Sequence, residues 1–473
     1  MNAAIFRDRA PGEIAVVGLG KSGGSAAALL ARDGHRVYAS DAGKGDAALR
    51  AAADLGRLGV AVDVGYHDLE RIGRAALVVA SPGVPPEAPP LAAARAGGVP
   101  VVGELEVALH YLPGLKYIAV TGTNGKTTTT ALVGHLLRAL GHEALDAGNI
   151  GTPLAQVALS DRRPNWVALE MSSFQLHDTP SVNPTVGVLT NLSPDHLDRY
   201  AGVEEYYVDK ARLFANAHPA SRWVVNGDDL AVEAMVHDVP GRVFRFSVRH
   251  DSHRPYGAPD AYYEPGNHRR AGSDMLLLRG EELLGRASFP LLGDHNVANA
   301  LAATLAVAVA DDAHGTPEAR RRVAEALRTF RALEHRLEPV GEFGGVEWIN
   351  DSKATNVSST LVALEGMTRP YVLLLGGRHK GEPYTALAEP FWRFGKAVLA
   401  YGEAAPIVER DLGGLVSVER LGSSFPDVVA RARELARPGD AVLLSPACSS
   451  YDMFRNYEER GAEFRRLAAG GRS

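Results

Sequence analysis

The stretch AVTGTNGKTTT, residues 119–129, decides the fold class that this sequence predicts. It joins the apolar run 117–120 to a glycine-containing segment, and a threonine- and leucine-rich run follows at 127–140. A buried strand, a glycine loop and a helix in this order form a cradle for phosphate, because the N–H groups of the loop and of the helix N-terminus carry partial positive charge. We therefore predict a P-loop in an α/β domain that binds a nucleotide.

This loop is a variant of the usual G-x-x-x-x-G-K-[ST] pattern, because Val120 occupies the place of the first glycine. We expect Lys126 to neutralise the β- and γ-phosphate oxygens and the Thr127 hydroxyl to bind Mg²⁺. A glycine turn that precedes a helix by chance is the alternative, and the flanking strand and helix argue against it. The predicted ATP-binding positions are Gly122, Thr123, Asn124, Gly125, Lys126, Thr127 and Thr128.

Length and composition place the chain among multidomain globular proteins. It has 473 residues, more than one hydrophobic core accommodates. Its net charge of -6 argues against nucleic acid or an anionic membrane as the main partner. The single cysteine, Cys448, excludes an intrachain disulfide and fits a reducing cytoplasm. The N-terminus lacks the apolar core of a signal peptide, and no apolar run reaches the roughly 20 residues that cross a bilayer.

Alternating strand and helix patterns predict three α/β domains in series, which we place at 1–111, 112–331 and 332–473. The first domain begins with a strand, a glycine turn, a helix and a second strand over 13–41, which implies a parallel sheet. The stretch 249–274 is polar and rich in Pro, Gly and His. Its three histidines lack the tight spacing of a metal site, so we expect a surface loop or hairpin there, with no role assigned.

Acidic and histidine side chains follow two predicted strands of the central domain. Glu170 ends one strand, and Asp195, His196 and Asp198 come after the next. Since α/β proteins collect functional side chains at the carboxyl ends of parallel strands, these residues should lie near the phosphate loop. Mg²⁺ needs more oxygen ligands than Thr127 supplies, which makes Glu170 a candidate ligand. For His196, the spacing alone leaves a structural role equally open.

Glycines in the first domain support a rival function. The segment GLGKSG, 18–23, follows the first strand and matches G-x-G-x-x-G, and Asp41 closes the second strand, where a ribose-binding acid is expected. This pattern predicts a Rossmann-like domain and would suit a nicotinamide-dependent oxidoreductase. It specifies only a diphosphate and a ribose, which a UDP group also offers. The phosphate loop, which a dehydrogenase does not need, favours an ATP-using enzyme with a nucleotide-like substrate.

Polar side chains follow three predicted strands of the last domain. They lie in INDSKATN (349–356), LGGRHKGEPY (375–384) and SPACSSYDMFRNY (445–457). Each segment alone could be a solvated loop. Because all three occur in one α/β domain, the pattern favours an anion-binding face.

In combination, these motifs resemble those of the Mur ligases of peptidoglycan synthesis. The resemblance follows the family's order over nearly the whole chain, and INDSKATN with LSPACSS is its most specific part. It rests on GLGKSG, VASPGVP, VVGELE, TGTNGKTTTT, GNIGTPL, LEMSSFQL, TNLSPDHLDRY, DKARLF, GDHNVANALAA, EHRLE, INDSKATN, LLLGGRHK and LSPACSSYDMFRNYEERG. The fold implied is a Rossmann-like N-terminal domain, a P-loop ATPase domain and an α/β C-terminal domain.

The activity implied is an ATP-dependent amide ligation of D-glutamate to UDP-N-acetylmuramoyl-L-alanine that releases ADP and phosphate. ATP would first phosphorylate the alanyl carboxylate, because an amine cannot displace oxide from a free carboxylate, and the glutamate amine would then attack the acyl phosphate. The alternatives are a ligase of the same fold that adds L-glutamate or another amino acid, the oxidoreductase, and a nucleotide-gated switch. We expect a cytoplasmic monomer that acts on small molecules, with no nucleic acid partner and no membrane insertion.

The resemblance also assigns residues to each ligand. The UDP group would contact Gly18, Gly20, Lys21, Ser22 and Asp41. The muramoyl part would face Asn149 and Ser173. Besides the phosphate loop, the nucleotide and its phosphates would meet Asn296, Asn299, Arg336, Asp351 and the catalytic Lys353. The incoming glutamate would lie among Thr355, Lys380, Ser450 and Tyr457. Thr127 and Glu170 would bind one magnesium ion, and His196 would contact a second.

Lys210 has a special role in the resemblance. Its counterpart in the family is carbamylated by CO₂, which converts an amine into an anionic oxygen ligand for magnesium. Arginine cannot do this because it stays protonated, and lysine is scarce here, with eight among 50 Lys and Arg residues. An ordinary exposed lysine on the helix YYVDKARLF is the alternative. The chain departs from the family at Tyr457, where Phe is frequent close to the glutamate pocket.

Overall fold

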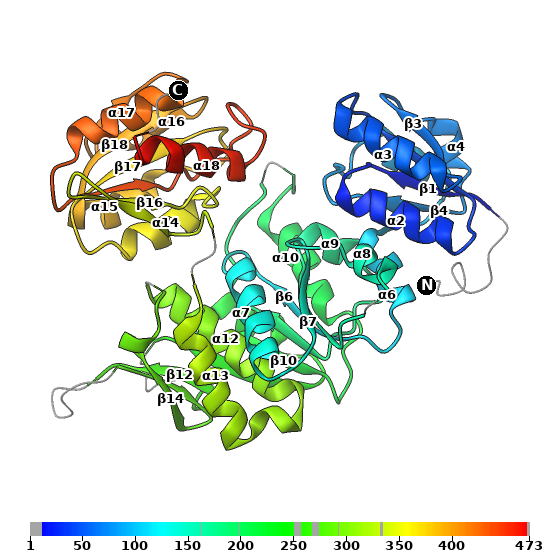
Figure 1. Cartoon of the computed structure of the whole chain (residues 1–473), viewed down its shortest axis with the longest axis horizontal. Helices are drawn as coiled ribbons and strands as arrows, with labels where there is room; N and C mark the ends of the chain where they lie inside the picture. Colours follow the sequence, from blue (N-terminus) through cyan, green and yellow to red (C-terminus); the bar gives the residue numbers. More distant parts are fainter. Residues whose placement is uncertain are drawn as a thin grey trace. The chain divides into compact units, whose positions relative to one another are not determined.

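The structure, a computed structural model, describes residues 12–161, 163–197, 199–249, 257–266, 274–291, 293–331 and 334–470. Contacts between residues group the chain into two compact units, which are described separately. The first unit runs to Leu192 and also holds Glu204–Arg286 and Asn299–Arg328. The second unit holds Ser193–Val203, Ala287–Ala298 and the chain from Thr329 onward. The first unit contains two sheets and the second contains one (Figure 1).

The first sheet is parallel throughout, as predicted, and its strand order β3-β2-β1-β4-β5 is that of a Rossmann-like domain. Its strands are β1 (Ile14–Val17), β2 (Val37–Asp41), β3 (Ala61–Val64), β4 (Leu77–Ala80) and β5 (Val101–Gly103). Its helices are α2 (Lys21–Arg32), α3 (Asp46–Arg57), α4 (Leu69–Gly73), α5 (Pro89–Ala96) and α6 (Glu104–Tyr111). Four of these elements, β3, α3, α4 and α5, were not among the sequence predictions.

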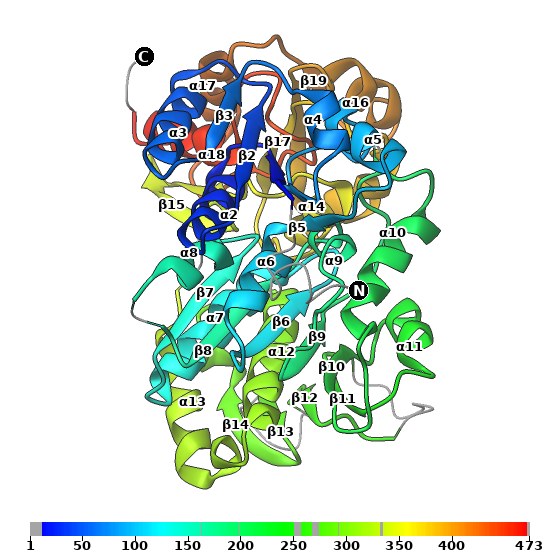
Figure 2. The same ribbon diagram turned by 90° about the vertical axis from the view of Figure 1, so that its right-hand side faces the viewer.

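Strand β1 shows why this sheet is covered on both faces. Ile14 and Val16 join the apolar cluster that includes residues of α2, whereas Ala15 and Val17 join the cluster that includes residues of α4 and α5. Because successive side chains of a strand point to opposite faces, a continuous apolar run needs a helical layer on each side. Figure 2 shows α2 and α3 on one side of the sheet and α4 and α5 on the other.

The second sheet has nine strands in the order β14-β13-β12-β11-β10-β9-β6-β8-β7. They are β6 (Lys116–Thr121), β7 (Ala144–Gly148), β8 (Trp166–Glu170), β9 (Val186–Leu189), β10 (Arg222–Asn226), β11 (Arg242–Ser247), β12 (Ala261–Glu264), β13 (Met275–Leu278) and β14 (Glu281–Gly285). Its helices are α7 (Lys126–Ala139), α8 (Leu154–Leu159), α9 (Ser173–His177), α10 (Val203–Ala211), α11 (Leu230–Val236), α12 (Asp294–Ala310) and α13 (Pro317–Thr329). The Ala-rich helix α12 is buried over 300–310, as its sequence predicts.

The polar stretch 249–274 forms part of an antiparallel extension of this sheet. Strand β12 pairs antiparallel with β13, and β13 pairs antiparallel with β14, whereas the strands from β7 to β12 are parallel. The paired β12 and β13 agree with the predicted hairpin. The three histidines of the stretch, His250, His253 and His268, lie outside the described residues.

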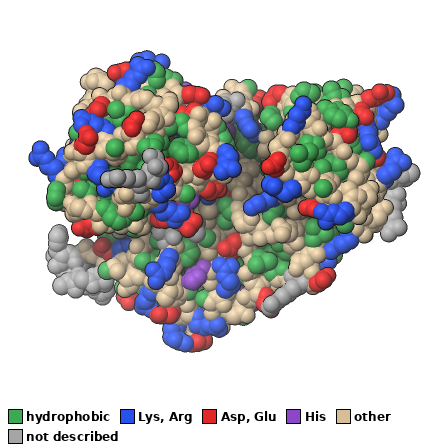
Figure 3. Space-filling model, turned by 45° about the horizontal axis from the view of Figure 1, so that its top comes forward, with side chains coloured by type: hydrophobic (Ala, Val, Ile, Leu, Met, Phe, Trp, Pro, Cys, Tyr) green, Lys and Arg blue, Asp and Glu red, His purple; other side chains and the backbone are tan. Residues whose placement is uncertain are grey.

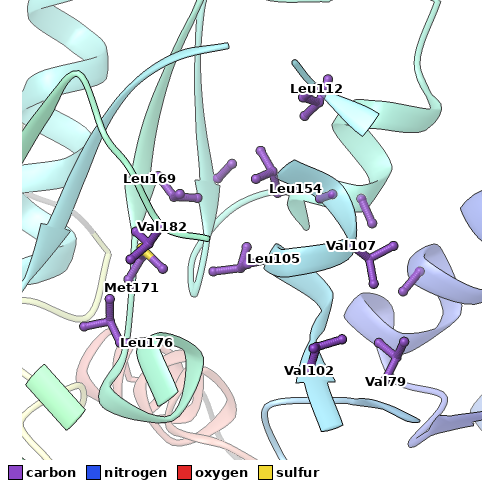
Figure 4. Packing of buried hydrophobic residues seen from close by; sticks show 14 of the residues in the cluster. Val79, Val102, Leu105, Val107, Leu112, Leu154, Leu169, Met171, Leu176 and Val182 are labelled. Atoms are coloured by element: carbon purple, nitrogen blue, oxygen red, sulfur yellow. The ribbon is translucent and has the colours of Figure 1, made fainter. Parts of the chain in front are cut away.

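One apolar cluster joins the two sheets of the first unit (Figure 4). It runs from Val79 and Val102 in the first sheet through Leu105 and Val107 on α6, and continues into the second sheet. The contributors on the central side include Leu154 on α8, Leu169 on β8, Met171, Leu176 on α9 and Val182. Because this core is continuous, α6 fixes how the loops of the first sheet stand beside those of the second.

The third sheet, in the second unit, has the order β15-β16-β20-β17-β18-β19, and only β15 runs antiparallel to its neighbour. Its strands are β15 (Glu338–Phe343), β16 (Val346–Asn350), β17 (Tyr371–Gly376), β18 (Gly395–Tyr401), β19 (Val418–Arg420) and β20 (Ala441–Leu444). Residues of α14 (Val357–Glu365), α15 (Ala388–Phe394) and α16 (Ala405–Leu412) cover one face. Residues of α17 (Phe425–Leu435) and α18 (Tyr457–Ala468) cover the other.

The surface carries charges of both signs. Lys and Arg side chains are interspersed with Asp and Glu side chains on the face that Figure 3 shows. Within the described ranges, no helix combines the length and the apolar character that crossing a membrane requires.

A buried carboxyl group lies where the two sheets of the first unit meet. Glu104, the first residue of α6, accepts a hydrogen bond at Oε1 from the backbone N–H of Ala155 on α8. Its Oε2 has no hydrogen-bond partner among the described residues. Burial raises the pKa of Glu104 from its ordinary 4.5 to about 7, and the Ala155 N–H offsets this in part.

We predict that Glu104→Gln flattens the pH dependence of stability. Because the pKa is raised in the folded protein, the folded state holds the proton more tightly, and wild-type stability should fall as pH rises from 4.5 to about 7. A loss of roughly 1–3 kcal/mol is expected over this range in the wild type and not in the variant. Urea unfolding at intervals between pH 5 and 8 measures it, and equal slopes for the two proteins would contradict the prediction.

Candidate active site

Two glycines shape the phosphate loop between β6 and α7. Gly122 has φ of 143°, and a Cβ on it would lie 2.0 Å from Thr190 Oγ1. Gly125 has φ of 78°, and a Cβ on it would lie 2.3 Å from Asn299 Oδ1. A side chain at either position would be both strained and blocked, so this loop path requires glycine.

The loop after β9 holds the phosphate loop in place. The backbone N–H groups of Thr123 and Asn124 donate to the carbonyl oxygen (2.9 Å) and the side-chain Oδ1 (2.8 Å) of Asn191. In return, Asn191 Nδ2 (3.0 Å) and Thr190 Oγ1 (2.6 Å) donate to the carbonyl oxygen of Asn124. Asn191 was not predicted as a site residue. It belongs to the motif TNLSPDHLDRY and lies two residues after the end of β9 at Leu189.

Lys126 lies at the centre of this loop. Its Nζ donates to the carbonyl oxygens of Gly122 (3.0 Å) and Thr123 (2.7 Å). Thr127 and Thr128 follow in the first turn of α7. The ammonium group thus lies over the loop at the N-terminus of α7, and a cation at a helix N-terminus is a combination that neutralises phosphate.

Glu170 is buried beside the loop, with 1% of its surface exposed. It ends β8, paired with Val120 of β6, and its Oε1 accepts from Asn149 Nδ2 at 2.8 Å. Its Oε2 is buried without a hydrogen-bond partner among the described residues. A buried anionic oxygen is costly unless a cation or donor satisfies it, so this carboxylate fits a magnesium ion.

The described residues contain no cluster of three His, Cys, Asp or Glu side chains that could hold a metal ion. A magnesium ion at Glu170 would therefore depend on hydroxyl groups and on oxygens of bound phosphate for its other ligands. That is the usual arrangement for Mg²⁺ in nucleotide sites, where one or two carboxylates act together with the substrate's phosphates.

Lys210 on α10 is buried, with 1% exposure, which contradicts the alternative of an ordinary exposed lysine. Its Nζ donates to the carbonyl oxygen of Gly122 at 2.7 Å and to Thr121 Oγ1 at 3.2 Å. The ring of Tyr206 lies 5.2 Å from the same nitrogen. Lys210 therefore contacts the phosphate loop directly.

Helix α12 presents two buried amides. Asn296 and Asn299 are three residues apart and so project from the same face of the helix. Asn299 Oδ1 accepts a hydrogen bond from Thr129 Oγ1 on α7 at 3.2 Å. Asn299 is thus beside the phosphate loop. The division between the two units falls within α12, so that Asn299 belongs to the first unit and Asn296 to the second.

A cavity of about 670 Å³ opens at the carboxyl edge of the first sheet. The sequence-predicted residues that line it are Gly18, Gly20, Lys21, Ser22, Asp41 and Asn149. Both oxygens of Asp41 accept backbone N–H groups, from Leu19 (2.6 Å) and Gly43 (2.7 Å). His67 and Gln175 line the same cavity and were not predicted. Ser173 is buried at the start of α9.

His196 lies in the second unit, in the segment 193–203. It has φ of 56°, and its backbone N–H donates to Asp195 Oδ1 at 2.9 Å. Asp195 Oδ2 accepts from Asn356 Nδ2 at 3.0 Å, and Lys380 Nζ is 3.9 Å from Asp195 Oδ1. The predicted Asp198 lies outside the described residues. Asp195 therefore connects the His196 segment to the loops after β16 and β17.

Asp351 is buried directly after β16. Its Oδ2 accepts from Ser445 Oγ at 2.9 Å, and its Oδ1 accepts from the backbone N–H of Leu337 at 3.2 Å. Burial raises the pKa of Asp351 to about 6, and the charge of Arg336 offsets part of this effect. Arg336 is thus close enough to Asp351 for their charges to interact, and the predicted contacts of both residues with the nucleotide stay a prediction.

The residues that the resemblance assigns to the incoming glutamate lie around the same edge of the third sheet. Lys353 Nζ is 5.4 Å from the ring centre of Tyr457, the first residue of α18, so the ring faces a cation. Lys380 Nζ donates to Thr355 Oγ1 at 3.4 Å. Ser450 is buried in the loop after β20.

Arg460 is a fully buried guanidinium that the sequence did not predict as a site residue. It donates to Ser352 Oγ (3.0 Å), to the carbonyl oxygens of Ser352 (2.8 Å) and Cys448 (3.1 Å), and to that of Gly376 (3.5 Å). Ser352 and Cys448 lie in the loops after β16 and β20, and Gly376 is the last residue of β17, where the loop that carries Lys380 begins. One side chain therefore ties together the three loops that carry Lys353, Lys380 and Ser450.

Comparison with known proteins gives matches along the whole chain. Three family profiles fit it: Mur ligase MurD-like, N-terminal domain, at 12–103; Mur ligase middle domain, at 120–307; and Mur ligase, glutamate ligase domain, at 335–448. A UDP-N-acetylmuramoylalanine–D-glutamate ligase of Anaeromyxobacter dehalogenans is 45% identical over 96% of this chain and 97% of its own length. The protein of the same name from Chromobacterium violaceum is 42% identical over 97% of each chain.

Solved structures of low identity share the fold. The UDP-N-acetylmuramate-alanine ligase MurC of Thermotoga maritima aligns with a TM-score of 0.61 at 20% identity, over 98% of this chain and 100% of its own. MurF of Acinetobacter baumannii aligns with a TM-score of 0.60 at 16% identity, over 93% and 92%. The predicted series of three α/β domains is confirmed.

We predict that Lys126→Ala abolishes detectable ATP binding, because the phosphates would lose the ammonium group that offsets part of their charge at the loop. A loss of at least a hundredfold in affinity is expected, in line with the cost of an unpaired charge in a buried site. Isothermal titration with Mg-ATP measures it. Lys116→Ala is the matched control, because Lys116 begins β6 at the end of the strand away from the phosphate loop, and this variant should bind as the wild type does. Equal affinity of Lys126→Ala and wild type would remove this lysine from the nucleotide site.

Proposed function

The chain belongs to the Mur ligase family, and on this basis we propose that it joins D-glutamate to UDP-N-acetylmuramoyl-L-alanine at the expense of ATP. The observation that carries this proposal is full-length similarity to curated D-glutamate ligases, at 45% identity in one case. The names of these relatives favour D-glutamate over L-glutamate and a ligase over an oxidoreductase. The phosphate loop, which hydride transfer does not need, agrees with that choice.

The proposed division of labour follows the three sheets. Residues 1–111 would bind the UDP group in the cavity that Gly18, Gly20, Lys21, Ser22 and Asp41 line. Residues 112–331 would bind Mg-ATP, and residues 332–473 would contact the nucleotide and hold glutamate. The continuous core around α6 supports the first assignment, because it places Asn149 of the central domain in the same cavity as the glycine loop.

Within the central domain, Lys126 and the N–H groups of the loop other than those of Thr123 and Asn124, which donate to Asn191, would hold the phosphates of ATP. Asn299, which contacts Thr129, would lie on the nucleotide side of α12 together with Asn296. Arg336 and Asp351 would approach the nucleotide from the C-terminal domain. The buried, hydrogen-bonded state of Asp351 supports a positioning role for this carboxylate.

A magnesium ion would be held by the Thr127 hydroxyl and by Glu170, whose Oε2 is buried and otherwise unsatisfied. When bound, the metal would neutralise phosphate charge and polarise the transferred phosphoryl group. His196 is the proposed contact for a second ion. Lys210 is proposed to be carbamylated, and its burial against the phosphate loop supports this, since an amine there is shielded from bulk water.

The proposed reaction assigns a role to each of these groups. The alanyl carboxylate, oriented by Asn149 and Ser173, attacks the γ-phosphorus of ATP, and the bond to the β-phosphate oxygen breaks to give an acyl phosphate and ADP. Lys126 and Lys353 offset the charge on the transferred group. The glutamate amine attacks the acyl carbon, loses a proton, and expels phosphate to leave an amide.

Glutamate would be held by Lys380 and Thr355, which are in contact, and by Ser450 and Tyr457. Two carboxylates need several donors, and a lysine with adjacent hydroxyls supplies them. The Tyr457 hydroxyl, where the family often has Phe, is proposed to add a hydrogen-bonding group at this end. We further propose that the enzyme acts as a monomer in the cytoplasm, where ATP and UDP-linked precursors occur.

The function is tested by one assay that supplies the purified chain with Mg-ATP, UDP-N-acetylmuramoyl-L-alanine and each glutamate enantiomer in turn. We expect phosphate release and a product of the mass of the amide with D-glutamate. Product with L-glutamate alone would contradict the stereochemical assignment. Phosphate release without an amide from any amino acid would contradict the ligase.

The proposed carbamate leads to a prediction for Lys210→Ala. This variant should be nearly inactive and should recover activity with short-chain carboxylic acids such as acetate or propionate, because they can place a carboxylate in the space that the side chain leaves. Lys126→Ala, which lacks a cation instead, is the control and should not recover. Rescue of Lys210→Ala by bicarbonate alone, or by none of these acids, would argue against a carbamate.

A further inference from the structure

The cavity at the edge of the first sheet has two distinguishable ends. Asp41 is the last residue of β2 and His67 lies in the loop after β3, on the side of the sheet beyond β1. On the other side of β1, the loop after β4 contributes Pro82, which also borders a smaller cavity with Gln175. Residues of the second sheet therefore enter the cavity at the β4 end, opposite His67.

The chemistry of the proposed reaction orients the substrate in this cavity. Asn149 bonds to Glu170 beside the phosphate loop, so the carboxylate that receives phosphate belongs at the Asn149 end. In UDP-N-acetylmuramoyl-L-alanine the alanyl carboxylate and the uridine are at opposite ends of the molecule. The uridine consequently falls at the end formed by Asp41 and His67.

Asp41 is already engaged at that end. Its Oδ2 accepts from Leu19 N at 2.6 Å and its Oδ1 from Gly43 N at 2.7 Å, so it holds two loops in position. Each oxygen keeps one further lone pair, but a carboxylate donates no hydrogen bond. Recognition of a base or ribose edge that contains both donors and acceptors needs a second side chain here.

His67 has the features of that side chain. Its Nδ1 is 2.8 Å from the Oγ of Ser40, a fully buried residue of β2, which fixes the plane of the ring. No other hydrogen bond to the ring exists within the part of the chain that the structure describes, so Nε2 is available to a ligand. Burial lowers the pKa of His67 below its usual value, with Asp41 opposing this effect, so the ring is neutral near pH 7.

We propose that His67 is a specificity-determining residue that binds the uridine of the substrate through Nε2, with Ser40 as its positioning partner. This inference rests on the proposed function, since it takes the UDP-linked substrate as given. A neutral imidazole fixed at Nδ1 offers one hydrogen-bonding atom, which suits either the polar edge of uracil or a ribose hydroxyl. Both belong to the same ligand, and the test separates them.

The test measures binding of UDP by titration calorimetry to the wild type, His67→Ala and His67→Gln. Removing one hydrogen bond should weaken UDP binding about two- to tenfold in His67→Ala. Glutamine can place an amide near the position of Nε2, so His67→Gln should retain most of the affinity, which a purely structural role for His67 would not predict. His237→Ala is the matched control, because His237 is exposed and pairs only weakly with Asp238.

Two further ligands locate the contact. If Nε2 binds the base, the preference of the wild type for UDP over CDP should shrink in His67→Ala. If it binds the sugar, the preference for UDP over 2′-deoxy-UDP should shrink instead. Ser40→Ala should weaken UDP binding in the same direction by a smaller factor, because the ring loses its anchor.

Steady-state kinetics give an independent readout. In His67→Ala the KM for the UDP-linked substrate should rise, while the KM for ATP and the kcat at saturation stay as in the wild type. Unchanged UDP affinity in His67→Ala, or an equal loss for ATP, would overturn the inference and leave the proposed ligase standing. Failure of the wild type to bind UDP at all would overturn both.

Discussion

The hydrogen bonds between Asn191 and the phosphate loop are the constraint on which the first unit depends. Two N–H groups of this loop, those of Thr123 and Asn124, donate to Asn191, so a neighbouring loop holds its shape. Asn191 does this with three groups, as donor and as acceptor, in the way an adjacent strand would. The path of the loop sets the carbonyl groups that Lys126 and Lys210 contact, and it leads into the first turn of α7, which holds Thr127.

The same edge of each sheet carries buried polar groups, and their surroundings give them different properties. Glu170 keeps one carboxylate oxygen without a hydrogen-bond partner, which suits a cation. Asp351 has both oxygens hydrogen-bonded and a raised pKa, which suits a role in holding neighbouring loops. Asp41 is similar to Asp351 in that both of its oxygens accept hydrogen bonds, in this case from two backbone N–H groups. Residue type alone does not separate a ligand from a support.

Strong local patterns made most of the fold predictable. The strand, glycine loop and helix around Lys126 can be recognised from residues 117–140 alone. The position of Glu170 near this loop could be inferred because it ends an apolar strand. His67 could not, because β3 has the sequence AVDV, is partly exposed, and lacks the apolar run of a central strand. The burial of Lys210 and Arg460 depends on what packs over them, which no local pattern records. The proposed roles of the site residues stay predictions until they are tested.

Arg460 also limits how such a chain can change over evolution. Its guanidinium bonds to the main-chain oxygens of Ser352, Gly376 and Cys448 and to the Ser352 hydroxyl, so most of its contacts depend on backbone paths. An insertion or deletion in any one loop would shift an oxygen and leave a buried positive charge without its neighbours. Length variation in this domain is therefore expected in the helices and in the turns at the opposite edge, and the three loops should keep a constant length together.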